Sequence, residues 1–181
     1  MPKTFTRAGR KHITIAFAAV LAPITMAGFL AVSGIRINTS YSLPLGLYVR
    51  TSDQRANLIE FCPEGRFAIQ SSSRGYRTHG FCPDGAVPLL KPVVAHRGDT
   101  VEVGARGIAV NGHLLPQTVP APKDLFARPL ESWPTGRYEV AEGTVWVASP
   151  YNPGSYDSRY MGPIPTRLIR ARLRPLWIFE R

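Results

Sequence analysis

The sequence predicts a mainly β domain over residues 37–181, preceded by a basic and apolar segment over residues 1–36. Three observations lead to this prediction. Residues 13–35 carry no charge, the apolar runs that follow them are short, and Asn111-Gly112 joins two such runs in the pattern most typical of a β-hairpin. A chain of 181 residues provides for one globular domain with a single core and a short additional segment.

The formal charge of +10 is divided evenly between the two parts of the chain. Residues 1–36 carry five basic residues and no acid, and residues 37–181 carry 15 Arg and two Lys against 12 acidic residues, which is also +5. Because the domain shows no long basic block and no known nucleic-acid-binding motif, we expect no nucleic-acid partner. Attraction to an anionic lipid bilayer accounts better for the surplus charge.

Residues 13–35 are long enough to cross a bilayer as a helix. These 23 residues would extend over roughly 34 Å, against about 30 Å of hydrocarbon, and Pro23 would bend the helix without preventing insertion. Four basic residues before the run and one after it predict an N-terminus in the cytoplasm and a domain on the opposite side. The alternative is a cleaved signal peptide ending near Ala31-Val32-Ser33, but the length of the run favours an uncleaved anchor.

The first part of the domain carries its two cysteines in near-copies of one turn sequence, at residues 61–65 and 81–85. We expect a strand at residues 47–49 before the first copy and a polar, flexible loop at residues 71–76 between the copies. In a domain that has crossed a membrane, a Cys62–Cys82 disulfide is expected, stabilising the fold by about 3 kcal/mol. Two reduced thiols or half of a zinc site remain as alternatives, although the spacing is unusual for zinc.

The second part of the domain reads as further strands. An apolar run at residues 88–95 contains Lys91, residues 100–103 alternate as a strand, and the Asn111-Gly112 hairpin follows. The proline-rich stretch at residues 117–136 predicts an irregular excursion. A strand at residues 143–148 then leads to the polar segment 155–163, and residues 169–174 alternate apolar residues with arginine, which predicts a half-buried strand with a cationic outer face.

Lysine is rare in the domain, which makes Lys91 a candidate base. Residues 37–181 contain lysine only at Lys91 and Lys123, and arginine cannot release its proton in a protein. An apolar surrounding from Leu89, Leu90, Val93 and Val94 would lower the pKa of Lys91 from about 10.4 towards 7–8, where it can act as a base. The alternative is a lysine at a strand edge with its ammonium group in water.

Ser42 is the matching candidate nucleophile. Its hydroxyl would attack a peptide carbonyl while neutral Lys91 takes the proton, and the Ser42 backbone N–H with the Ser40 hydroxyl would stabilise the oxyanion. Pro44 and Gly46 would hold this loop rigid beside the membrane. A serine before Leu-Pro is otherwise an ordinary turn residue, and the scattered histidines make a Ser–His–Asp triad a weak interpretation.

Three sequence blocks in order carry a family resemblance. They are Ser-Leu-Pro-Leu-Gly-Leu-Tyr at 42–48, Leu-Leu-Lys-Pro-Val-Val-Ala at 89–95 with Gly-Asp-Thr-Val after it, and Ser-Tyr-Asp-Ser-Arg-Tyr-Met-Gly-Pro at 155–163. With these blocks the chain resembles the type I signal peptidase family of membrane-bound serine–lysine endopeptidases. It resembles the conjugative-transfer branch, the TraF-type peptidases, more closely than the housekeeping enzymes, and the resemblance covers essentially the whole chain.

The resemblance implies a signal-peptidase-like β catalytic domain that needs no metal or cofactor, and it implies roles for individual residues. Ser42 corresponds to the nucleophile, Lys91 to the general base and Ser40 to the oxyanion-hole hydroxyl. The closing motif is expected to orient the lysine and to brace the site through an ion pair. Within this motif, Asp157 is expected to be more important for activity than Arg159. Its matching residues are Ser155, Asp157, Ser158 and Arg159. Pure scaffolding is the alternative for the ion pair.

The expected function follows from this resemblance. Leu43, Pro92 and residues 149–153 depart from the housekeeping pattern, so the transfer branch is favoured: maturation of a membrane-bound pilin precursor for conjugative DNA transfer, with or without joining of its ends. The expected location is the bacterial inner membrane with the domain in the periplasm, or the periplasm if the N-terminal segment is cleaved. The alternatives are a general signal peptidase acting on exported precursors and a non-catalytic assembly protein of the transfer apparatus.

Overall fold

The protein is described from a computed structural model, in which residue 25 and residues 33–179 are described. The chain divides into two compact units, Met1–Arg36 and Ile37–Arg181. Most of the predicted membrane segment, residues 13–24 and 26–32, lies outside the described residues. Among the residues that are described, no helix has the length and apolar character needed to cross a bilayer.

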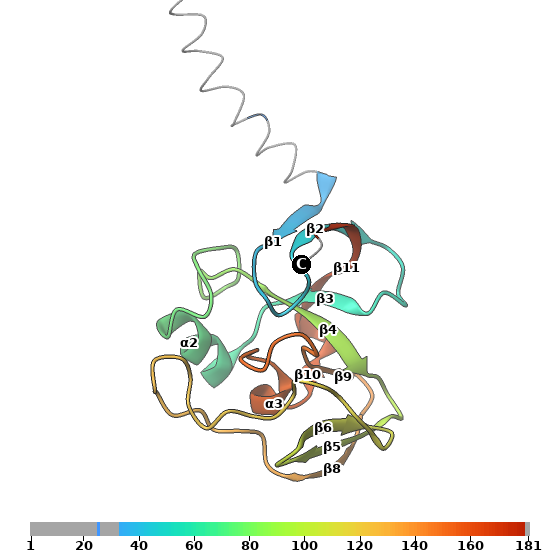
Figure 1. The fold of residues 1–181 in the computed structure, drawn as a ribbon. Helices are drawn as coiled ribbons and strands as arrows, with labels where there is room; N and C mark the ends of the chain where they lie inside the picture. The colour runs from blue at the N-terminus through green and yellow to red at the C-terminus, as the bar shows by residue number, and fades with distance from the viewer. Residues whose placement is uncertain (1–24, 26–32, 180–181) are drawn as a thin grey trace, which may run out of the picture. The chain divides into compact units, whose positions relative to one another are not determined.

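Residues 35–179 consist mainly of strands that form two sheets (Figure 1). In chain order the strands are β1 (Ile35–Asn38), β2 (Gly46–Thr51), β3 (Leu58–Phe61), β4 (Leu89–Ala95), β5 (Thr100–Gly104), β6 (Gly107–Val110), β7 (His113–Leu114), β8 (Gly136–Glu139), β9 (Thr144–Val147), β10 (Ile164–Pro165) and β11 (Ile169–Ile178). The larger sheet has the order β1-β2-β11-β3-β4-β9-β10, and the smaller has the order β7-β6-β5-β8. The predicted mainly β domain is therefore confirmed.

The strand pairing brings distant parts of the chain together. The C-terminal strand β11 inserts between β2 and β3 and pairs with both in antiparallel fashion. β3 in turn pairs with β4, where Lys91 lies opposite Ile59. Ser42 lies in the loop between β1 and β2, and Lys91 lies in β4. These three strands belong to the same sheet, although the two residues are 49 positions apart in the sequence.

The predicted loop at residues 71–76 is wrong in its first half, because Ser71–Ser73 end a helix. This helix is α2 (Gly65–Ser73), and between residues 37 and 179 the other helical elements are α3 (Ser158–Met161) and the 3-10 turn η1 (Thr166–Leu168). Ser71 and Ser72 donate their hydroxyl protons to helix carbonyls four residues earlier, at 2.6 and 2.9 Å. This bonding satisfies the serine side chains inside the helix, so their polar composition does not indicate a loop here.

Several sequence-based predictions are confirmed. The strand predicted at residues 47–49 is part of β2, and Asn111 and Gly112 both have positive φ angles in the turn between β6 and β7, as the predicted hairpin requires. Residues 117–135 follow an irregular path. In β11 the predicted alternation holds in part, because Leu173 is buried and Arg170 and Arg174 are exposed, but Arg172 is half-buried.

Cys62 and Cys82 form the predicted disulfide, with their Cα atoms 5.6 Å apart. Both sulfurs are used by this bond, so the alternatives of reduced thiols and of half a zinc site are excluded. The first copy of the repeated turn sequence runs from β3 into α2, and only the second copy forms a turn. The disulfide therefore ties both ends of the segment that contains α2.

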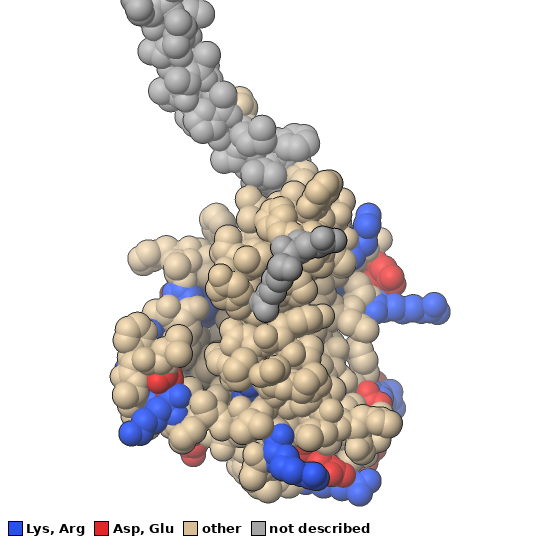
Figure 2. Space-filling view, in the orientation of Figure 1, with Lys and Arg blue, Asp and Glu red and all other residues tan. Residues whose placement is uncertain are grey.

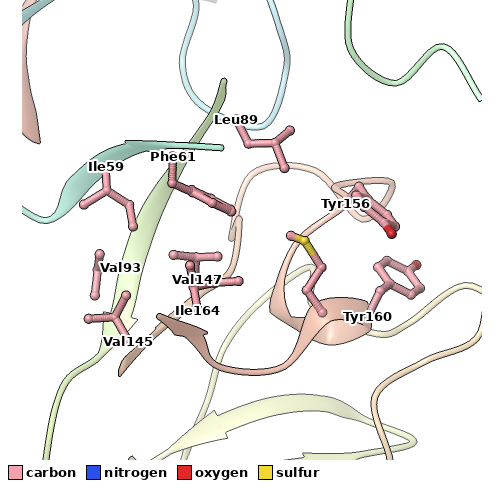
Figure 3. Close-up of a cluster of buried hydrophobic side chains, with 10 residues drawn as sticks. Ile59, Phe61, Leu89, Val93, Val145, Val147, Tyr156, Tyr160 and Ile164 are labelled. Carbon is pink, nitrogen blue, oxygen red and sulfur yellow. The ribbon is translucent and has the colours of Figure 1, made fainter. Parts of the chain in front are cut away.

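The main core lies between the larger sheet and α3 (Figure 3). Ile59 and Phe61 of β3 meet Val145 and Val147 of β9 there, and Tyr160 of α3 packs against them. On the face seen in Figure 2 most of the charged side chains lie around the margin. The core therefore fixes α3 and the residues just before it against the sheet.

Candidate active site

Ser42 lies in the loop between β1 and β2, and several contacts hold this loop in place. Ser42 is buried, and the next residue, Leu43, packs with Tyr48 in a small apolar cluster. The side-chain amide of Asn38 donates hydrogen bonds to three carbonyls of the loop at 2.9–3.3 Å. The Tyr48 hydroxyl donates to the carbonyl of Pro44 at 2.7 Å. The loop is thus held from both strands.

Gly46 ends this loop, and its lack of a side chain matters. A Cβ atom there would overlap the backbone carbonyl oxygen of Trp177 in the neighbouring strand β11. Residues 46 and 178 are direct partners in the β2–β11 ladder. Glycine is therefore required because another backbone approaches closely, which supports the predicted rigidity of the loop.

Lys91 points at Ser42 from strand β4. Its Nζ lies 2.6 Å from the Ser42 Oγ and 2.8 Å from the Ser155 Oγ, and the residue is only 4% exposed. The alternative of a lysine with its ammonium group in water is wrong. The alternation of the strand places Leu89 and Val93 on the same face as Lys91, as expected.

Leu90 and Val94 do not surround Lys91 as expected. They occupy the intermediate positions of β4, and side chains alternate between the two faces of a strand. Leu90 packs instead against the small cluster that contains Leu43. The predicted apolar surrounding of Lys91 is therefore half right.

Burial lowers the pKa of Lys91 from its ordinary 10.5 to about 8. The negative charge of Asp157 acts in the opposite direction and raises this pKa, and the positive charge of Arg159 lowers it. Near neutral pH a usable fraction of Lys91 is therefore neutral, and a neutral amine 2.6 Å from a hydroxyl can accept its proton.

The segment 155–159 completes the polar cluster. Ser155 is buried, and its Oγ lies 3.3 Å from the Ser42 Oγ, so the two hydroxyls and the Lys91 amine form a triangle. Asp157 and Arg159 are fully buried and form a two-point ion pair at 2.8 and 3.0 Å. Such a bidentate pair offsets the cost of burying both charges.

The remaining two predicted residues lie apart from the triangle. Ser158 is buried at the start of α3 and accepts a hydrogen bond from the Val147 N–H at 2.9 Å, which links α3 to β9. Ser40 is exposed on the Ser42 loop, where its N–H donates to the Asn38 side chain at 3.2 Å. Its role in an oxyanion hole stays a prediction.

Two polar residues that contact the Ser42 loop were missed in the sequence. Asn38 precedes the loop. Ser149 follows β9 by two residues and donates its hydroxyl proton to the Ser42 carbonyl at 2.6 Å. In the sequence, Ser149 was noted only as part of residues 149–153, which depart from the pattern of the housekeeping signal peptidases. Its position just after an apolar strand was a weak indication, because sequence spacing does not reveal which carbonyl a serine reaches.

Comparisons with known proteins identify the family to which the chain belongs. The family model described as "Signal peptidase, peptidase S26" matches residues 10–177. A plasmid transfer protein TraF from Escherichia coli is 36% identical over 165 residues, which cover 90% of this chain and 92% of that protein. A probable conjugal transfer protein TraF from Sinorhizobium fredii is 39% identical over 155 residues, 80% of each chain.

A crystal structure of a signal peptidase I from Enterococcus faecalis V583 also matches, at 21% identity. It covers 69% of this chain and 99% of its own with a TM-score of 0.38, which is too low to support any detail of the site. The sequence matches extend over nearly the whole chain, including the Ser42 loop, β4 and the segment before α3. The chain therefore belongs to the signal peptidase family, peptidase S26.

Proposed function

We propose that this protein is a membrane-anchored serine endopeptidase that processes a pilin precursor for conjugative DNA transfer, with Ser42 as nucleophile and Lys91 as general base. One observation carries the proposal. The Lys91 amine lies 2.6 Å from the Ser42 hydroxyl in a buried site where its pKa falls to about 8. A lysine with a purely structural role has no need of a lowered pKa, whereas a general base must be neutral near the working pH.

The reaction follows from this geometry. Neutral Lys91 takes the proton of the Ser42 hydroxyl as its oxygen attacks the peptide carbonyl, which produces a tetrahedral oxyanion and an ammonium group on Lys91. Lys91 then returns the proton to the nitrogen of the leaving peptide as the peptide bond breaks, and an acyl-enzyme remains on Ser42. Water releases the acyl group by hydrolysis, and an amine of the substrate would instead release it as a new peptide bond.

The oxyanion needs donors close to the nucleophile. Within the described part of the chain, the Ser42 N–H donates no hydrogen bond, so it is available to the oxyanion. The hydroxyl of Ser40, exposed two residues earlier, is the second proposed donor. Ser155 accepts a hydrogen bond from Lys91 and keeps the amine directed at Ser42.

The substrate class and location rest on two supports. The similar proteins from E. coli and S. fredii are named for plasmid or conjugal transfer, which favours a pilin precursor over exported proteins in general. The uncharged run at residues 13–35 with basic residues before it favours an anchor in the inner membrane and a periplasmic domain. A general signal peptidase and a non-catalytic assembly protein are the competing functions.

The test is processing of a conjugative pilin precursor in membranes that contain the full chain. Ser42→Ala and Lys91→Ala should each abolish processing, whereas the exposed matched controls Ser73→Ala and Lys123→Ala should leave it unchanged. Mass spectrometry of the product distinguishes hydrolysis from ring closure, which differ by the mass of one water. Processing that continues in both site variants would show that the protein is not the peptidase. Equal processing of unrelated exported precursors would show a general signal peptidase.

A further inference from the structure

Ser149 is fully buried, and each of its polar groups is bonded to the site. Its N–H donates to the Asp157 carboxylate at 3.0 Å, and its carbonyl accepts from the Arg159 guanidinium at 3.2 Å. Its hydroxyl donates to the Ser42 carbonyl at 2.6 Å. The same oxygen accepts from the Tyr151 N–H at 3.2 Å, which leaves the hydroxyl proton for Ser42.

We propose that Ser149 is a positioning residue that fixes the backbone of Ser42 and thereby aligns its hydroxyl with Lys91. This inference rests on the proposed function and names a residue outside the proposed catalytic pair. With the Ser42 carbonyl held by Ser149 and Leu43 buried beside it, rotation about the Ser42 side-chain bond is the main freedom left to the nucleophile. The Asp157–Arg159 ion pair holds Ser149 itself, so the ion pair acts on Ser42 through this residue.

The effect of Ser149 differs in kind from that of the ion pair. Removing the Ser149 hydroxyl leaves the charges of Asp157 and Arg159, which shift the pKa of Lys91, in place. The pH at which processing reaches half its maximal rate should therefore stay where it is, and the maximal rate should fall. Asp157→Asn, in contrast, removes a charge that raises the pKa of Lys91, so its midpoint should move to lower pH.

The experiment measures the rate of pilin-precursor processing by the full chain in detergent between pH 6 and 10. Ser149→Ala should lower the maximal rate about 10- to 100-fold with an unchanged midpoint, as expected for a displaced nucleophile. Ser71→Ala is the matched control, because Ser71 is equally buried and its hydroxyl also donates to backbone carbonyls. Its maximal rate should stay within about twofold of wild type, since the bonds that it loses, to helix carbonyls and from the Arg77 side chain, lie away from Ser42.

A second pair of variants covers the case in which Ser149→Ala fails to fold. The side chains introduced by Ser149→Thr and Ser149→Val have nearly the same shape and differ by the hydroxyl. The maximal rate of processing should therefore be higher for Ser149→Thr than for Ser149→Val. Equal rates for Thr and Val, or a wild-type rate for Ser149→Ala, would overturn the inference. Failure of the proposed function would look different, because Ser42→Ala would then process the precursor as fast as wild type.

Discussion

Processing should depend on pH through the deprotonation of Lys91. With its pKa lowered to about 8, roughly a tenth of the protein carries neutral Lys91 at pH 7 and about nine tenths at pH 9. The rate should therefore rise about tenfold between these pH values and then level off. A lysine with its ordinary pKa of 10.5 would produce a rise of about a hundredfold over the same range with no plateau.

The same shift in the pKa of Lys91 should appear in the stability of the protein. Lys91 binds its proton more weakly in the folded state than in the unfolded chain, so between pH 8 and 10.5 the unfolded state binds more protons. The free energy of unfolding should therefore rise with pH in this window, by about 2 kcal/mol between pH 7.5 and 10. Well below pH 8 the lysine is protonated in both states, and this contribution no longer changes.

Lys91→Met isolates this effect, because it keeps the length of the side chain and removes the titrating group. Urea unfolding of the full chain in detergent, followed by tryptophan fluorescence, would be compared for wild type and variant from pH 6 to 10. The difference between the two curves cancels the other titrating groups and should change only above about pH 7.5. A constant difference over the whole range, or a rate that still climbs steeply at pH 10, would refute a buried lysine with a lowered pKa.

Two further predictions concern the frame of the site. Replacing both Cys62 and Cys82 with Ala should lower the free energy of unfolding by about 3 kcal/mol, since the unfolded chain loses a cross-link that closes a loop of about 20 residues; an unchanged urea midpoint would contradict this. Asp157→Asn should lower the free energy of unfolding by about 3–5 kcal/mol, because Arg159 is then buried without its carboxylate partner. Asp157→Asn together with Arg159→Met should recover part of that loss in the same unfolding measurement, and no recovery would argue against an unpaired charge as its cause.

The fold was predictable wherever local rules decide the conformation. Asn111-Gly112 adopts positive φ angles that suit a tight hairpin, and Arg170, Leu173 and Arg174 follow the exposed and buried faces of a strand as the alternation predicts. Helix α2 was missed because its serines satisfy their hydroxyls within the helix, a choice that composition does not reveal. Local chemistry also could not predict that β11 separates β2 from β3, because such pairing depends on contacts distant in sequence.

The identity of the candidate site residues came from the sequence, through the rarity of lysine in the domain and the three blocks around Ser42, Lys91 and Ser155. Their relation in space came only from the tertiary structure. Packing of the sheet removes water from Lys91, which lowers the pKa of its amine. The same packing places this amine 2.6 Å from the Ser42 hydroxyl. The contact of Ser149 with Ser42 was also found only in the tertiary structure, because a hydrogen bond between residues 107 positions apart depends on the folded backbone. Sequence thus determined which groups can react, and packing decided which of them meet and in what charge state.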